Sequence, residues 1–469
     1  ETRPCCGRTA VRPYNRLLQN RAKLERETWT ALVEDQRWRL PSTPCGFIMS
    51  SQKEHLMKDR VQSKQSESSR ISSRRRFLKS SAVLAGVAGA CSDSQPVVDP
   101  NPGTLGVPAS AYGQRSEFEA SVRQTTPSST PEAGASRTPL DESYGVLTPS
   151  SLHFERHHAG VPRIDPAQHR LLIHGMVDRP LILTMEEILR LPQVSRIHFI
   201  ECSGNSGSEW ANPRPNPQGS HGMVGGSEWT GVPLSLLLSE VGVQDGARWI
   251  VGEGADACRM HRSIPMEKAL GDIILAYGQN GEAIRPEQGY PLRLVVPGWE
   301  GNTHIKWLRR LMVVDQPYMA RDETSKYTDL MPDGTARQFT FTMEAKSVIT
   351  FPSGRKRLAG PGIYQISGLA WSGRGLVDSV EISTDGGRSW LEAQLQEPFH
   401  PIALTRFRLP WQWDGREVTL QSRCIDETGY VQPSREQLIE VRGLNTRYHY
   451  NGIMVWRVLA DGSVENAYA

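Results

Sequence analysis

The chain has 469 residues and a formal net charge of +3, with 22% charged and 38% hydrophobic residues. This length allows two or three domains with hydrophobic cores of their own. A net charge so small for the length gives no indication of nucleic-acid binding.

The first part of the chain is typical of an export leader. Residues 1–48 precede the first methionine and are interpreted as an upstream extension. Residues 49–90 combine a basic stretch, ending in Arg-Arg-Arg-Phe-Leu-Lys at 74–79, with a short apolar run that closes on Ala-Gly-Ala. This order predicts a twin-arginine (Tat) signal and hence a periplasmic protein. The alternative is a basic patch beside a short core helix. The apolar run is too short for a membrane span.

The segment that follows, residues 91–143, is rich in Ser, Pro, Gly and Thr and is predicted to be a flexible arm. Cys91 also permits a lipoprotein variant of the signal, which the residues favour less. Without the extension and Cys91, the cysteines are Cys202, Cys258 and Cys424, too few for a disulfide framework. A cysteine kept single in an oxidising compartment is favoured as a ligand.

Residues 144–320 read as an α+β domain in which short apolar segments alternate with helical stretches. A helix is predicted over 185–191 with Thr184 as its cap, and another over 234–241, opened by Pro233 and ended by Gly242. The predicted strands include 171–173, 197–200, 249–251, 292–296 and 311–314.

The sequence pattern changes in residues 321–440, where closely spaced strands are predicted. They lie at 364–371, 377–383, 390–395, 402–409 and 418–425. Asp-Gly-Gly at 385–387 predicts a hairpin turn, and 411–415 is expected to interrupt the chain before the last strand. Alternation at Leu420, Ser422 and Cys424 predicts that one face of that strand is buried. The pattern indicates a β-sandwich of immunoglobulin-like size. Residues 441–469 are a C-terminal extension, expected to pack back through 453–458.

Cys202 stands where the apolar run 197–200 gives way to a Gly/Ser/Asn loop. It is either a core cysteine or a thiolate that meets a cofactor. A zinc site at His153, His157 and His158 is less favoured, because their spacing matches no known site. The sequence has no G-x-S-x-G, H-E-x-x-H, P-loop or paired C-x-x-C motif. It also has no C-x-x-C-H motif, so no haem is expected in this chain.

Several motifs between residues 145 and 440 occur together in a fixed order. They are Phe154 to His158, Glu201 to Asn205, Trp229 to Leu234, Ser263 to Pro265, Gly289 to Arg293, Val296 to Gly298, Lys306 to Leu308, Gly368 to Gly373 and Ser383 to Trp390. In this order they resemble the sulfite oxidase family of molybdopterin enzymes. The resemblance implies a molybdopterin-binding domain followed by an immunoglobulin-like β-sandwich dimerisation domain. It also implies one mononuclear molybdenum, held by a pterin dithiolene and a protein thiolate.

The resemblance further implies the roles of individual residues. Cys202 falls at the thiolate position, and a soft, anionic sulfur suits molybdenum. Arg156 falls beside the metal, where it would attract an anionic substrate. The positions matching those that hold the pterin and its phosphate are Phe154, Glu155, Arg156, His157, His158, Asp256, Gln288, Arg293, His304, Ile305 and Lys306. Arg293 and Lys306 would supply fixed positive charge for the phosphate.

Three departures from the family's sulfite oxidisers concern the substrate. Met260 replaces a tyrosine, Ser206 and Gly207 replace a pair of arginines, and Gln288 replaces the usual histidine. A pocket with less charge suits a bulkier sulfur group. The sequence thus resembles one branch of the family, the molybdenum subunit of sulfane dehydrogenase.

That branch implies oxygen-atom transfer to a sulfane sulfur on a carrier protein, with electrons passing to a separate dihaem c-type cytochrome. A homodimer or a heterotetramer is expected. The alternatives are a dehydrogenase of free sulfite, a reductase of sulfoxides, and a cofactor-free β-sandwich interaction protein.

Overall fold

The computed structural model describes residues 105–106, 108–128 and 130–468. The predicted extension, Tat signal and Cys91 therefore lie outside the described residues. The chain divides into two compact units, 1–111 and 112–469, and all that follows concerns the second. No helix within the described ranges is long and apolar enough to cross a membrane.

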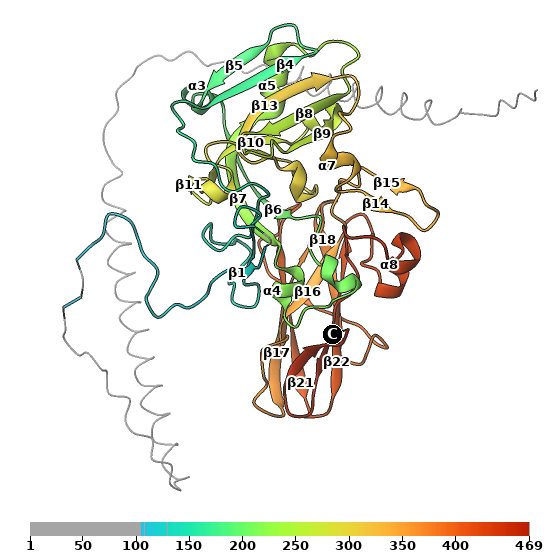
Figure 1. Ribbon diagram of the computed structural model, residues 1–469. Coiled ribbons are helices and arrows are strands. Elements are labelled where there is room, and N and C mark those ends of the chain that lie inside the picture. The colour runs from blue at the N-terminus through green and yellow to red at the C-terminus, as the bar shows by residue number, and fades with distance from the viewer. Residues whose placement is uncertain (1–104, 107, 129, 469) are drawn as a thin grey trace, which may run out of the picture. The chain divides into compact units, whose positions relative to one another are not determined.

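Two sheets build the first domain (Figure 1). One has the order β5-β4-β13-β8-β9, in which only β13 and β4 are parallel. Its strands are β4 (Arg170–Gly175), β5 (Leu181–Thr184), β8 (Trp249–Gly254), β9 (His261–Pro265) and β13 (Leu308–Val314). The other sheet is antiparallel, with the order β11-β10-β7-β6 and β12 paired to β10. Its strands are β6 (Val194–Glu201), β7 (Val224–Pro233), β10 (Ile274–Gln279), β11 (Glu282–Ala283) and β12 (Arg293–Val295).

The helices of this domain are short. The predicted helix at 185 is α3 (Met185–Leu189), which ends two residues early and begins with a capping box between Thr184 and Glu187. The second prediction is confirmed by α5 (Leu234–Val241), which buries Leu234, Leu237 and Leu238 in the core and ends at Gly242. The remaining short elements are α4 (Pro217–His221), α6 (Met266–Ala269), α7 (Arg321–Thr324), and the 3-10 turns η1 (Gly207–Trp210), η2 (Pro286–Gln288) and η3 (Gly301–Thr303).

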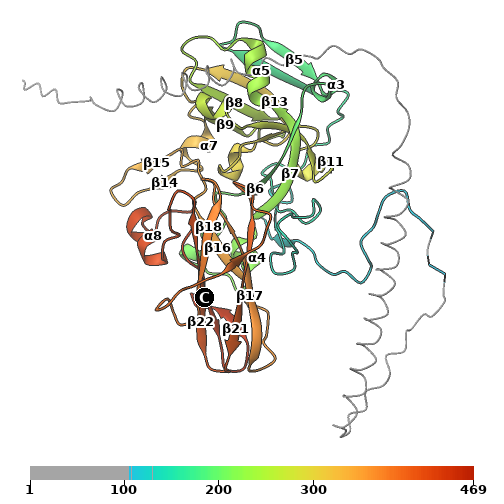
Figure 2. The ribbon, with the colours of Figure 1, turned by 180° about the vertical axis from the view of Figure 1, so that it is seen from behind.

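The second domain is a sandwich of two antiparallel sheets, as predicted; Figure 2 shows its long strands from behind. One sheet has the order β16-β17-β21-β20: β16 (Lys346–Phe351), β17 (Gly362–Trp371), β21 (Thr405–Trp413) and β20 (Gln394–Leu395). The other has the order β19-β18-β22-β23-β24: β19 (Leu391–Glu392), β18 (Val377–Ser383), β22 (Val418–Asp426), β23 (Val455–Val458) and β24 (Val464–Asn466). Leu420, Ser422 and Cys424 of β22 are buried, which confirms the predicted alternation.

Two predictions about this domain were wrong. The interruption expected at 411–415 begins later, because β21 stays paired with β17 as far as Trp413, opposite Gly362. The strand at 418 is also not the last, since β23 pairs with β22 and β24 with β23. The C-terminal extension therefore packs back as two further strands of the sheet. Helix α8 (Arg435–Arg442) precedes these two strands in the chain. A small hairpin of β14 (Asp329–Leu330) and β15 (Ala336–Arg337) comes before the first strand of the sandwich.

The flexible arm predicted over 91–143 is ordered in its last part. A hairpin of β1 (Gln124–Thr126) and β2 (Ala135–Arg137) pairs with β3 (Glu155–Arg156). Thr138, directly after β2, is buried and donates a hydrogen bond to the carbonyl of Val224 at 2.7 Å. Pairing and burial thus stabilise a segment whose polar composition predicts disorder.

Candidate active site

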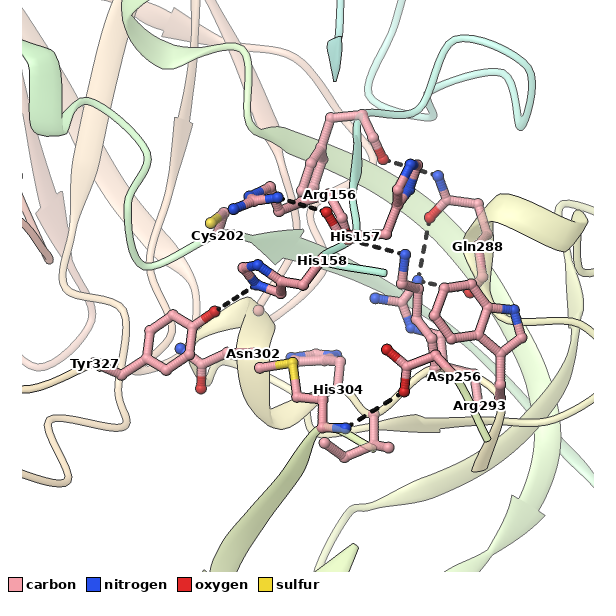
Figure 3. A pocket seen from close by; sticks show the side chains of 16 residues that line it. Arg156, His157, His158, Cys202, Asp256, Gln288, Arg293, Asn302, His304 and Tyr327 are labelled. Carbon is pink, nitrogen blue, oxygen red and sulfur yellow. Dashed lines mark hydrogen bonds between the residues drawn. The ribbon is translucent and has the colours of Figure 1, made fainter. Parts of the chain in front are cut away.

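A cavity lies in the first domain, where β3, the end of β6, β12 and η3 meet (Figure 3). It is lined by Phe154, Arg156, His157, His158, Cys202, Asp256, Met260, Gln288, Arg293, Gly301, Asn302, His304, Ile305, Lys306, Trp307 and Tyr327. Every site residue predicted from the sequence is among them except Glu155. That side chain instead pairs with Arg123 at 3.2 Å and lies 3.8 Å from His157.

Cys202 follows β6 directly, and its backbone is tightly held. Its N–H donates to the carbonyl of Met223 at 3.0 Å, and its carbonyl accepts from the N–H of Asn205 at 2.8 Å. Gly301 packs on this backbone so closely that a Cβ there would lie 2.7 Å from the carbonyl oxygen of Glu201. Burial raises the pKa of the Cys202 thiol, which a hydrogen bond from Gly204 and the charge of Arg156 oppose. A bound soft cation would stabilise the thiolate.

The residue before this cysteine fixes the loop to the second domain. The buried carboxylate of Glu201 lies 2.6 Å from Nζ of Lys346 on β16. It also accepts from Nε1 of Trp371 at 2.7 Å and from Nδ2 of Asn205 at 2.9 Å. Asn205 in turn accepts from the N–H of Met223 at 3.0 Å. Three donors from both domains therefore determine where Cys202 lies.

A second buried network supports the loop from the other side. Arg262 pairs with Glu300 at 2.9 Å, and His449 Nε2 lies 3.2 Å from the same carboxylate. The N–H of His449 also donates to the carbonyl of Ser203 at 2.8 Å. Asn302 donates to the Ser203 hydroxyl at 3.0 Å. The C-terminal part of the chain thus contacts the loop that carries Cys202.

Two further cations line the cavity: Arg293, at the end away from Cys202 (Figure 3), and Lys306. Arg293 is buried, donates only to the carbonyl and side chain of Gln288, and leaves its Nε without a partner. Nζ of Lys306 donates to the carbonyls of Arg156 and Glu287 at 2.9 and 3.0 Å. No carboxylate of the described residues forms an ion pair with either cation. Burial lowers the pKa of Arg293 to about 9. Burial and Arg293 lower the pKa of Lys306 to about 7.

Such unpaired, desolvated cations are costly unless an anion joins them. In addition to Arg293 and Lys306, Arg156 lines the cavity, against the single carboxylate of Asp256. The donor set therefore fits a ligand with a phosphate at one end and a soft metal at the other, beside Cys202. A molybdenum-bound pterin carries both of these groups.

The histidines of the cavity are neutral at pH 7. Burial, with the charge of Arg156, lowers the pKa of His158 to about 4. Burial and Arg293 place the pKa of His304 well below its ordinary value. Neutral rings can donate or accept hydrogen bonds to a pterin. His153 does not line the cavity but stacks behind it on Phe154 at 5.0 Å. No group of three metal-binding side chains occurs in the described part of the chain, so the zinc hypothesis finds no support.

Sequence reasoning missed Tyr327, whose hydroxyl lies 3.2 Å from Nε2 of His158. No motif surrounds it, and its backbone has a left-handed φ of 53°. Its ring lies under Arg262 and beside Tyr448, at 5.4 and 5.3 Å. Burial raises its pKa far above the ordinary range, so the phenol stays protonated. Only the fold reveals this residue, because it lies 169 positions from His158, the site residue that it contacts.

Comparison with known proteins agrees with this site. The family model described as "Oxidoreductase molybdopterin binding domain" matches residues 158–321, and "Mo-co oxidoreductase dimerisation domain" matches 337–455. Sulfite oxidase of Gallus gallus is 31% identical, over 65% of this chain and 72% of that protein. NADH nitrate reductase of Ulva prolifera and mitochondrial sulfite oxidase of Drosophila melanogaster are each 32% identical, over 62% and 64% of this chain. The chain spans 38% and 58% of those two relatives.

A solved structure is also similar, that of the sulfane dehydrogenase SoxCD from Paracoccus pantotrophus. The TM-score is 0.78 with 46% sequence identity, over 81% of this chain and 99% of that one.

Proposed function

The chain belongs to the sulfite oxidase family of molybdopterin oxidoreductases, and from this premise we propose that it oxidises sulfane sulfur carried on another protein. The observation that carries the cofactor assignment is the cavity itself. It holds a desolvated thiol, a buried arginine and a half-buried lysine, and neither cation forms an ion pair with an acid of the described residues. This membership speaks against a cofactor-free interaction protein.

Molybdopterin, when bound, supplies oxygen-atom transfer and two-electron chemistry. Cys202 would hold the metal, Arg293 and Lys306 the phosphate, and neutral His158 and His304 the pterin. Arg156 lines the cavity beside Cys202 and would orient an anionic sulfur there. The protein's part is to position these groups and to exclude water.

The loop after Cys202 contributes no charged side chain at positions 206 and 207, which supports a carried sulfane sulfur over free sulfite. Ser206 and Gly207 do not line the cavity. A Cβ on Gly207 would lie 2.5 Å from the carbonyl oxygen of Arg447, so the backbone here leaves no room for an arginine. Met260, an apolar side chain, does line the cavity. A small, doubly charged oxyanion such as sulfite needs several positively charged partners, which these residues do not supply. A sulfane sulfur carried on another protein needs fewer of them.

The proposed reaction balances with water and a one-electron acceptor. Each oxygen atom added to sulfur comes from one water molecule and releases two protons and two electrons. The electrons would leave singly to a c-type cytochrome, which we propose is a dihaem partner subunit. The similarity to a structure titled SoxCD supports such a partner and an oligomer, either a homodimer or a heterotetramer. Tat export to the periplasm and a sulfur-carrier protein complete the proposal.

Metal analysis and a substrate comparison test this function. The purified protein should contain one molybdenum and reduce cytochrome c with a sulfane-loaded carrier. Faster turnover of free sulfite would reject the carried substrate, and turnover only with a reduced donor and a sulfoxide would favour the reductase. Cys202→Ser should lose both metal and activity, whereas Cys424→Ala, in the core of the second domain, should keep them. Retention of metal by Cys202→Ser would reject the ligand assignment.

A further inference from the structure

The ordered arm reaches the surroundings of the cavity through one arginine, Arg123, which directly precedes β1. Its guanidinium lies 3.2 Å from the carboxylate of Glu155 on β3 and 3.6 Å from that of Glu287 on η2. It also donates a hydrogen bond to the carbonyl of His153 at 3.4 Å. Only 19% to 23% of each of the three charged side chains is exposed, so these ion pairs are partly shielded from water.

The two acids that Arg123 binds belong to the segments that Lys306 contacts. Nζ of Lys306 donates to the carbonyl of Glu287 itself and to that of Arg156, the residue after Glu155. Burial lowers the pKa of Lys306, and the charge of Glu155 opposes this shift, so the two groups lie close enough to interact. Either carboxylate, without Arg123, would be attracted to this ammonium group.

Lys306 retains one hydrogen-bond donor for a ligand. An ammonium group has three N–H bonds, and the two carbonyls use two of them. Within the described ranges no third acceptor lies at hydrogen-bond distance, and no acid pairs with Lys306. Because Lys306 lines the cavity, its third N–H is available to an anion bound there.

Hydrogen bonds rather than apolar packing hold the arm against β3. Residues 123–138 contain no Val, Leu, Ile or Met and no aromatic residue. The N–H of His157 donates to the carbonyl of Gly134 at 3.1 Å, and that of Gly160 to the carbonyl of Glu132 at 2.7 Å. Gly134 has no room for a Cβ, which would collide with the ring of His157. The arm thus lies directly on the strand that carries Glu155.

We propose that Arg123 is a positioning residue for the cofactor, which binds Glu155 and Glu287 so that Lys306 stays free for the phosphate. Without Arg123, two carboxylates next to an anion site would compete for Lys306 and repel the phosphate. This inference rests on the cofactor assignment of the proposed function. It adds a residue that lies before the segment 158–321 matched by the molybdopterin-binding family model.

Release of pterin from the purified holoprotein tests this role. Pterin lost during incubation is separated by gel filtration and measured by its fluorescence after oxidation. Arg123→Met should release pterin about tenfold faster than the unaltered protein. Adding Glu155→Gln and Glu287→Gln to Arg123→Met should return the rate to within about twofold of the unaltered protein, because neutral amides do not compete for Lys306. The control Arg408→Met, at an exposed arginine of β21, should leave the rate unchanged.

Unchanged release from Arg123→Met would overturn the proposal. Equally fast release from the triple variant would also overturn it, because Arg123 would then act only by tethering the arm. Calorimetric titration of the cofactor-free chain with inorganic phosphate is a second measurement, and the affinity should weaken and recover in the same order. An affinity that ignores Arg123→Met would contradict the role of Arg123. If the purified protein contains no molybdenum or pterin but its phosphate affinity follows this order, the proposed function is rejected and the role of Arg123 stands.

Discussion

Replacing Lys346 by methionine should destabilise the protein strongly, because it leaves the carboxylate of Glu201 buried without its counter-charge. The two groups lie 2.6 Å apart, and both side chains are at most 1% exposed. Breaking a buried pair from one side costs about 3–5 kcal/mol. Trp371 and Asn205 continue to donate to the carboxylate, so the lower part of that range, about 3 kcal/mol, is expected.

Urea unfolding followed by tryptophan fluorescence measures this loss. Adding Glu201→Gln to Lys346→Met should recover more than half of it, because a neutral amide needs no counter-charge. The control is Arg190→Met, which breaks the exposed pair with Glu186 and should cost no more than about 0.5 kcal/mol. If Lys346→Met costs as little as this control, or if the second substitution makes matters worse, the reasoning about this pair is refuted.

Three further predictions concern the site. Arg293→Gln should lower the pterin content, measured by the fluorescence of the released, oxidised pterin; full occupancy would contradict a role for Arg293 in phosphate binding. Glu300 is buried, which raises its pKa, but Arg262 and His449 lower it to about 2, below the ordinary 4.5. Since the folded pKa is the lower one, this stability is present above pH 4.5 and is lost as the pH falls towards 2. In a plot of the unfolding midpoint against pH, Glu300→Gln should therefore reduce the slope at acid pH. An unchanged slope would count against the ion pair. Tyr327→Phe removes only the hydroxyl at His158 and should raise KM for a sulfane substrate roughly fivefold with unchanged molybdenum content; an unchanged KM would limit Tyr327 to packing.

The site residues that the sequence could predict are those inside short, ordered motifs. Cys202, Arg293 and Lys306 were identified because each stands in such a motif, and the fold then brings them to one cavity. Among the positions that the resemblance implies, Glu155 is the one that does not line this cavity; its side chain pairs with Arg123 of the ordered arm. The arm itself was not predictable, because its order comes from pairing with β3 rather than from its own composition.

What the sequence did not reveal depends on contacts between distant residues. Tyr327 reaches His158 across 169 positions, and Lys346 reaches Glu201 across 145. No periodicity or local motif encodes such pairs. The end of β21 is mispredicted for a similar reason, since the sequence indicates an interruption at 411–415 but not how far β21 stays paired with β17.

The contact between His449 and the loop of Cys202 also determines when this loop can be completed during protein synthesis. The carbonyl of Ser203 receives its hydrogen bond from a residue made almost 250 positions later, in the segment that leads into β23. The first domain therefore cannot complete the hydrogen bonding of the Cys202 loop while the ribosome is still translating the second. Cofactor insertion is accordingly expected on the finished chain, after both domains have folded against each other.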